Sequence, residues 1–172
     1  AGGEVLIKNV IPKHLDCITA KLREMGVRVT EYDDSIRVES TRRLRRANVK
    51  TMPYPGFPTD MQAPMMALAL SLRGTSVFLE TIFENRFMHA REMVRMGASI
   101  RIEDRIALVS GGHPLGGTNV TSTDLRGGAA LMLCGLLAEG ETTLHDPNGQ
   151  IARGYEDLPG MLRALGAEVE EE

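Results

Sequence analysis

The sequence predicts an α/β fold in which helices form the interior and sheets form the outside. Segments 63–72 and 129–138 are apolar on nearly every side of a helix, so both helices are expected to be wholly buried. The strands predicted around them alternate apolar and polar residues, which is typical of sheets with one dry and one wet face. Buried helices combined with half-exposed sheets reverse the layering of a doubly wound fold.

A supersecondary unit of about 70 residues recurs along the chain. Gly26, Gly97 and Gly166 each follow the end of a predicted helix and precede an alternating strand. A glycine suits the left-handed position that commonly ends a helix. The recurrence predicts one domain over 1–172. Its units lie at approximately 1–40, 53–110 and 116–172.

The first unit is incomplete. The predicted strand 3–7 matches the strand that follows the buried helix in the other units, but no such helix precedes it. We therefore expect the chain to be part of a larger protein. The other strands are predicted at 27–30, 36–39, 74–79, 100–103, 106–109, 140–144 and 169–170.

The first buried helix is approached through Met-Pro-Tyr-Pro-Gly-Phe-Pro-Thr-Asp-Met-Gln-Ala, residues 52–63. Its prolines impose an extended approach, because each fixes its own φ and disfavours helix just before it. Thr59 followed by Gln62 predicts a capping box, with the helix beginning at Asp60. Thr123–Arg126 is predicted to open the second buried helix in the same way.

The composition is that of a globular protein. The 172 residues are 42% hydrophobic and 25% charged with a net charge of −3, which supports neither nucleic acid nor a membrane surface as partner. The longest apolar runs are about ten residues, against the ~20 that span a bilayer, and no charged-then-apolar leader is present. Cys17 and Cys134 lack metal-ligand spacing and fit a reducing compartment. We expect a cytoplasmic protein.

Charged side chains at the starts of helices are the candidate functional residues. Asp60 and Asp124 occupy equivalent positions in two units, where free backbone N–H groups and the helix dipole favour anions. Arg86, Arg126 and Arg153 also precede or begin helices. Guanidinium groups bind carboxylate and phosphate bidentately, so three of them predict a site for an anionic substrate. For any one of these side chains, the alternative is helix-end stabilisation or a surface ion pair.

Four motifs, in this order, resemble those of the bacterial UDP-N-acetylglucosamine enolpyruvyl transferases. They are Phe57–Ala63 (FPTDMQA), Glu80–Met88 (ETIFENRFM), Thr123–Arg126 (TDLR) and Arg153–Glu156 (RGYE). The resemblance covers the whole chain and concerns the C-terminal half of such enzymes. It implies an inside-out α/β barrel domain built from about three repeats. It also implies a similar N-terminal domain, absent from this chain, across an active-site cleft.

The resemblance implies transfer of the enolpyruvyl group of phosphoenolpyruvate to the 3-hydroxyl of UDP-N-acetylglucosamine, the first committed step of peptidoglycan synthesis. Asp60 would bind that hydroxyl and act as its general base, with Asp124 beside the reacting centre. Ile82 and Phe83 would contact the nucleotide sugar, and the three arginines named above would bind the phosphate and enolpyruvyl charges. No metal or redox cofactor is required.

The chain departs from the family pattern at two places. The family's loop cysteine, which protonates or traps phosphoenolpyruvate, belongs to the other half, and neither Cys17 nor Cys134 matches it. The family usually has Tyr-His-Ile-Asp before the Arg153 motif, where this chain has Gly149–Ala152 (GQIA). The isolated chain is therefore expected to be inactive.

Two other functions remain open. The shikimate-pathway enolpyruvyl transferase (EPSP synthase) shares the fold, although the FPTDMQ and NRF runs favour the UDP-sugar enzyme. A non-catalytic half-barrel that only binds or assembles is the alternative from a different class. Calorimetry with UDP-N-acetylglucosamine distinguishes them, because only the first function requires uptake of the nucleotide sugar.

Overall fold

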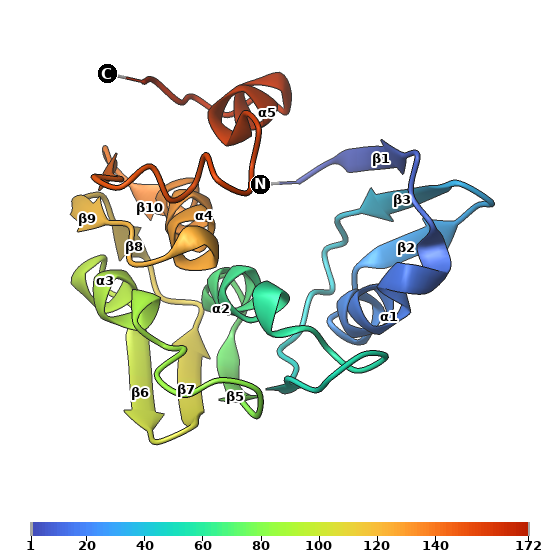
Figure 1. Ribbon diagram of the computed structural model, residues 1–172, viewed down its shortest axis with the longest axis horizontal. Coiled ribbons are helices and arrows are strands. Elements are labelled where there is room, and N and C mark those ends of the chain that lie inside the picture. Colours follow the sequence, from blue (N-terminus) through green and yellow to red (C-terminus); the bar gives the residue numbers. More distant parts are fainter. Residues whose placement is uncertain (1, 172) are drawn as a thin grey trace.

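The computed structural model describes residues 2–171 as a mixed α/β fold (Figure 1). Two short 3-10 helices, η1 and η2, accompany the helices and strands. The elements in chain order are β1 (Glu4–Lys8), η1 (Pro12–Leu15), α1 (Asp16–Glu24), β2 (Arg28–Glu31), β3 (Ser35–Glu39), β4 (Val49–Lys50), η2 (Thr59–Met61), α2 (Gln62–Leu70), β5 (Gly74–Leu79), α3 (His89–Arg95), β6 (Ser99–Glu103), β7 (Ile106–Gly111), β8 (Leu115–Gly116), β9 (Asn119–Thr121), α4 (Leu125–Gly135), β10 (Ala138–Glu139), β11 (Thr143–His145) and α5 (Leu158–Ala164).

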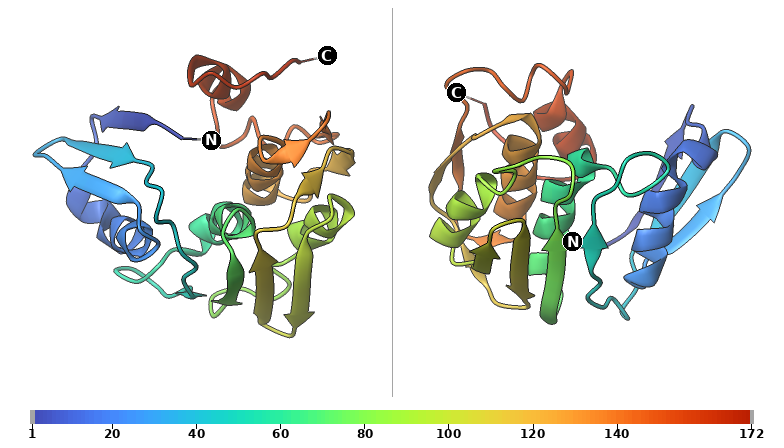
Figure 2. Two further views of the ribbon diagram at one scale, coloured as in Figure 1. Left: turned by 180° about the vertical axis from the view of Figure 1, so that it is seen from behind. Right: turned by 60° about the horizontal axis from the view of Figure 1, so that its bottom comes forward.

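The strands form several small sheets rather than one large one. β1, β3 and β2 make an antiparallel sheet in that order, and β4-β5-β7-β6 make a second sheet in which only the β4–β5 pair is parallel. Two further parallel pairs join β8 to β10 and β9 to β11. The first sheet and α1 stand to one side, and segment 40–58 leads from them to α2 (Figures 1 and 2).

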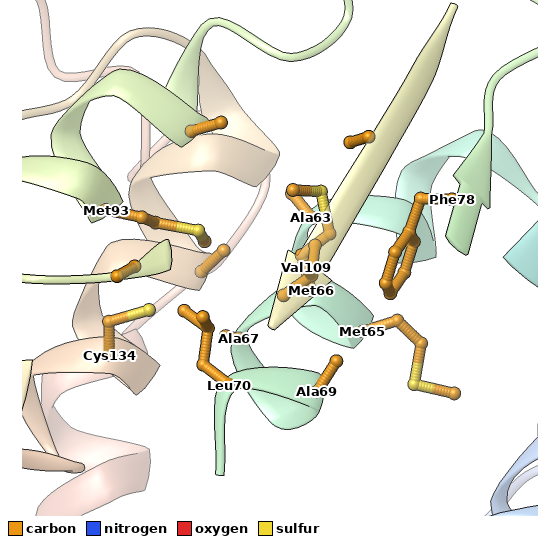
Figure 3. Close-up of a cluster of buried hydrophobic side chains, with 14 of the residues drawn as sticks. Ala63, Met65, Met66, Ala67, Ala69, Leu70, Phe78, Met93, Val109 and Cys134 are labelled. Carbon is orange, nitrogen blue, oxygen red and sulfur yellow. The ribbon is translucent and has the colours of Figure 1, made fainter. Parts of the chain in front are cut away.

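The core is centred on α2, as the apolar pattern predicted. Nearly every residue of α2 is buried, and the helix packs against α4 and the β5–β7 pair. Figure 3 shows its side chains among Phe78 of β5, Val109 of β7, Met93 of α3 and Cys134 of α4. Methionine and alanine supply much of this core, which suits a chain with few aromatic residues. α4 is buried over 127–131, but it ends at Gly135 and Leu136 is 41% exposed. The prediction of a wholly buried helix over 129–138 is therefore wrong at its C-terminal end.

Along β5 and β7 the larger sheet has one dry and one wet face, as predicted, whereas every residue of β1 is exposed. Along β7 buried and more exposed residues alternate, and Ala107 and Val109 face the core. Gly111, at the end of β7, allows the closest approach to α2, because a methyl group there would collide with the carbonyl oxygens of Ala69 and Leu72. The helices are therefore inside and the larger sheet covers them.

The repeated glycines adopt the predicted backbone conformation. Gly26, Gly97 and Gly166 have φ of 88°, 96° and 91°, and each lies two residues after the last residue of a helix. A residue with a side chain is strained at such angles, so the glycines fix these helix ends. The strand predicted at 169–170 is wrong, because the described residues after α5 form none.

The start of α2 differs from the prediction. Thr59–Met61 form η2, α2 begins at Gln62 rather than Asp60, and neither helix start has a side-chain cap. The hydroxyl of Thr59 and the side-chain amide of Gln62 donate instead to the carboxylate of Glu80, at 3.0 and 3.5 Å. The predicted capping box is therefore wrong, because a residue distant in sequence binds both of its members.

The start of α4 does carry a local cap. Asp124 is its N-cap residue, and one carboxylate oxygen accepts hydrogen bonds from the backbone N–H groups of Arg126 and Gly127, both at 3.0 Å. These bonds satisfy two of the free donors of the first turn. Within residues 2–171, no helix has the length and apolar character that crossing a membrane requires.

Candidate active site

The charged residues predicted at the helix starts lie around a single pocket. Its volume is about 360 Å³, and it collects side chains from η2, from the loop before α3, from the start of α4 and from the loop before α5. The lining residues are Asp60, Arg86, Asp124, Leu125, Arg126, Gln150 and Arg153. Segments almost a hundred residues apart thus place three arginines and two aspartates together.

Asp60 lies between two of the arginines. Its Oδ1 is 3.2 Å from Nη2 of Arg86, and its Oδ2 is 3.0 Å from Nη2 of Arg126. The carboxylate side chain is 54% exposed, whereas the two guanidinium side chains are 23% and 27% exposed. The arginines are thus held by the protein, and their shared carboxylate faces solvent at the mouth of the pocket.

Arg126 is held by contacts with Asp60 and Tyr155. Burial opposes its charge, but the Tyr155 hydroxyl and the Asp60 carboxylate outweigh burial and raise the pKa of the guanidinium above its ordinary value. The guanidinium carbon lies 5.3 Å from the centroid of the Tyr155 ring, within cation–π range. Tyr155 was not among the predicted site residues, although it belongs to the Arg153–Glu156 motif.

Arg153 and Asp124 complete the charge balance of the pocket. Within residues 2–171 the exposed side chain of Arg153 makes no hydrogen bond or ion pair, so its guanidinium is available to a ligand. Asp124 is already engaged as the α4 cap. The pocket therefore holds three guanidinium groups and two carboxylates, of which Asp60 is paired with two arginines and Asp124 caps α4, so it favours anions.

Ile82 and Phe83, also predicted as site residues, lie beside the pocket rather than in its lining. Both follow β5 in the loop that continues to Arg86. The Phe83 side chain is 52% exposed, and its ring centroid lies 5.6 Å from the guanidinium carbon of Arg86. Phe83 therefore presents an exposed apolar face at the rim, next to the arginines.

Neither cysteine belongs to this pocket. Cys134 is fully buried in α4, and burial raises the pKa of its thiol to about 12, so almost none of it is thiolate near neutral pH. Cys17 lines a different, largely apolar hollow of about 480 Å³ between α1 and the β4–β5 edge. That hollow is larger than the charged pocket, but it lacks any pairing of carboxylate and arginine in its lining.

His89 is a buried neutral base behind the pocket. It is 1% exposed, and its Nε2 lies 3.4 Å from Sδ of Met66. Burial lowers the pKa of its imidazole to about 4, although the charge of Asp124 acts in the opposite direction. His89 therefore stays neutral at physiological pH.

We expect His89 to make the fold sensitive to acid. The unfolded chain takes up a proton near pH 6.5, whereas the folded chain does so only near pH 4. The contribution of neutral His89 to the free energy of unfolding is therefore fully present above pH 6.5. It falls by about 3 kcal/mol as the pH is lowered to 4. Urea unfolding from pH 7.5 to 4 should show this loss in the parent chain and in His14→Gln, an exposed histidine. His89→Gln should lack that part of the pH dependence, and an unchanged pH dependence in His89→Gln would contradict the assignment.

Comparison with known proteins identifies the family of the chain. Residues 1–171 match the family model described as EPSP synthase (3-phosphoshikimate 1-carboxyvinyltransferase). The chain is 52% identical over 168 residues to UDP-N-acetylglucosamine 1-carboxyvinyltransferase 1 of Caldanaerobacter subterraneus subsp. tengcongensis, covering 98% of the chain but 40% of that relative. It is 54% identical to the UDP-N-acetylglucosamine 1-carboxyvinyltransferase of Desulfofundulus thermocisternus, covering 97% of the chain and 68% of that relative.

Solved structures show the same fold. The enolpyruvyl transferase NikO from Streptomyces tendae superposes with a TM-score of 0.88 at 30% identity, over 99% of this chain and 40% of NikO. An EPSP synthase from Acinetobacter baumannii superposes with a TM-score of 0.74 at 18% identity, over 100% of this chain and 40% of that protein. The chain thus spans about two fifths of these proteins. The chain belongs to the EPSP synthase (3-phosphoshikimate 1-carboxyvinyltransferase) family, and within it to the UDP-N-acetylglucosamine 1-carboxyvinyltransferases.

Proposed function

We propose that the chain supplies one domain of an enzyme that transfers the enolpyruvyl group from phosphoenolpyruvate to the 3-hydroxyl of UDP-N-acetylglucosamine. In this reaction the sugar oxygen bonds to C2 of phosphoenolpyruvate, the bond from C2 to the phosphate oxygen breaks, and phosphate leaves. The observation that carries the proposal is the placement of Asp60 between two arginines, with a third arginine free in the same pocket. The names of the relatives agree with it.

The arginines suit a substrate that carries both a carboxylate and a phosphate. Arg153 is exposed and free, whereas Arg86 and Arg126 are paired with Asp60. An incoming anion competes with Asp60 for these two cations. When it takes them, the Asp60 carboxylate is released to accept the proton of the attacking hydroxyl. A positioned carboxylate in this role typically contributes ~10²–10⁴-fold to the rate.

The rim of the pocket suits the nucleotide sugar. Phe83 offers an exposed apolar ring beside Arg86, and Ile82 lies next to it in the same loop. The pocket is open on the side of Asp60, where a second domain would close over the substrates and exclude water. We include in the proposal an inside-out barrel of about three repeats, a partner N-terminal domain, a cytoplasmic location and a role in peptidoglycan synthesis.

A hybrid enzyme tests the proposal. It joins residues 1–172 to the Caldanaerobacter relative, in place of the region that the chain matches. With phosphoenolpyruvate we expect phosphate release when UDP-N-acetylglucosamine is the acceptor and none above background with shikimate 3-phosphate. Arg101→Ala, which removes a surface arginine of β6, serves as the control and should not alter the rate. Activity with shikimate 3-phosphate alone would favour the EPSP synthase function. Heat-stable folding without either activity would favour a binding module.

A further inference from the structure

Glu80 is a fully buried carboxylate to which the proposed reaction assigns no role. It follows β5 directly and is 1% exposed. Within the described residues, no lysine, arginine or histidine forms an ion pair with it. A buried charge without a counter-ion is costly unless hydrogen bonds replace the lost water.

Five donors supply those hydrogen bonds, and they divide between the two oxygens. Oε1 accepts from the hydroxyl of Thr51 at 2.9 Å and from the backbone N–H groups of Ile82 and Phe83 at 2.9 and 3.2 Å. Oε2 accepts from the Thr59 hydroxyl at 3.0 Å and from the Gln62 side-chain amide at 3.5 Å. A carboxylate has about four lone-pair sites, so this one is saturated.

The two oxygens hold two different parts of the site. Thr59 and Gln62 flank Asp60 on either side, so Oε2 fixes the turn that presents the proposed base. Ile82 and Phe83 form the rim of the pocket, so Oε1 fixes the loop proposed to contact the nucleotide sugar. In a low-dielectric interior, a fully satisfied network of this kind makes the attached segments rigid.

We propose that Glu80 is a positioning residue that aligns the Asp60 turn through Oε2 and the Ile82–Phe83 loop through Oε1. It acts through these residues and does not touch the substrate. The inference rests on the proposed function. We call the hydrogen bonds to Oε1 the Oε1 arm and those to Oε2 the Oε2 arm. A displacement of about 1 Å at a reacting group costs up to 10²-fold in rate, so loss of either arm is expected to change the kinetics. The two arms hold different parts of the site, so the two changes should differ.

The variant Glu80→Gln separates the two arms. Its side-chain amide keeps one oxygen and replaces the other with a donor. The backbone N–H groups of Ile82 and Phe83 cannot turn away, whereas the Thr59 hydroxyl can rotate, so the retained oxygen takes the place of Oε1. The rotated Thr59 hydroxyl accepts from the new amide, so Glu80→Gln reverses the hydrogen bond of the Oε2 arm and removes its charge. Thr59→Val removes that hydrogen bond altogether.

Steady-state kinetics of the hybrid enzyme test this assignment. We expect Thr59→Val to lower kcat roughly 10- to 100-fold and Glu80→Gln to lower it by less, with KM for UDP-N-acetylglucosamine within about 3-fold of the parent in both. The double variant should be little worse than Thr59→Val, because both changes act on the same arm. Thr59→Ser, which keeps the hydroxyl, should restore kcat. Glu80→Ala loses both arms, so it should also raise KM.

Two controls separate positioning from stability. Ile36→Ala truncates a buried residue of β3, away from the pocket, and should lower the unfolding midpoint without changing kcat or KM.

In the 172-residue chain, amide hydrogen exchange of Ile82 and Phe83 should be slow in the parent and in Thr59→Val but faster in Glu80→Ala. This readout needs no activity, so it tests the Oε1 arm even if the hybrid is inactive and the proposed function fails. Kinetics unchanged in Thr59→Val, or exchange unchanged in Glu80→Ala, would overturn the inference.

Discussion

Asp60→Asn in the hybrid enzyme is expected to lower kcat by about 10² to 10⁴-fold while leaving the fold intact. An asparagine side chain has nearly the same size, and its single oxygen can still accept from one of the two arginines, Arg86 or Arg126. It cannot take up the hydroxyl proton. The stability cost should be small, because the carboxylate is 54% exposed and exposed ion pairs contribute about 0–1 kcal/mol. Phosphate release gives kcat, and urea unfolding gives the stability.

Glu103→Gln is the matched control for this prediction. Glu103 is also an exposed carboxylate paired with an arginine, Arg101, but it lies on β6 outside the pocket. Its replacement should leave kcat unchanged and alter stability as little as Asp60→Asn does. If Asp60→Asn keeps near-normal turnover, Asp60 has only the role of a charge near a helix start.

Several predictions that depended on local sequence alone were confirmed. A glycine after a helix needs no distant partner to adopt a left-handed conformation, and Gly26, Gly97 and Gly166 all do so. The apolar run that forms α2 was expected to be buried on all sides, because hydrophobicity without periodicity leaves no face for water. The relation between inner helices and outer sheets follows from these same patterns.

The predictions that failed depended on partners distant in sequence. Thr59 and Gln62 have the spacing of a capping box, but their side chains bind Glu80, about twenty residues further along. The strand at 169–170 fails for a related reason. β2 and β6 pair with the strands that follow them, β3 and β7, whereas no strand follows α5 in the described residues. An alternating pattern alone does not make a strand, because its backbone groups need a partner.

The candidate site likewise contains residues that the local sequence predicted and residues that it did not. Its charged residues were found from helix starts and motifs, and the structure brings Asp60, Asp124, Arg86, Arg126 and Arg153 to one pocket. The contact of Tyr155 with Arg126 joins the loop before α5 to α4, and no spacing in the sequence indicates it. Glu80 lies inside a recognised motif, but the sequence does not show that it is buried.

The 172-residue chain by itself is expected to release no phosphate from phosphoenolpyruvate and UDP-N-acetylglucosamine. Asp60, Phe83 and Arg153 are all exposed, so the proposed base and two binding groups remain in contact with bulk water. Charge interactions that stabilise a transition state are far weaker in water than in a closed site. Neither thiol compensates, because Cys134 is buried with its pKa raised to about 12 and Cys17 lies outside the pocket.

The measurement compares the chain with the hybrid enzyme at equal concentration. The chain should give no phosphate above background, while the hybrid, in which the rest of the Caldanaerobacter relative faces the same pocket, turns over. Calorimetry of the chain with phosphoenolpyruvate should still detect weak binding, because Arg86, Arg126 and Arg153 are in place without the second domain. Arg126→Ala should abolish that binding, whereas Arg101→Ala should not. If the chain alone releases phosphate at a rate near that of the hybrid, one domain suffices. Exclusion of water by a second domain is then not required for this chemistry.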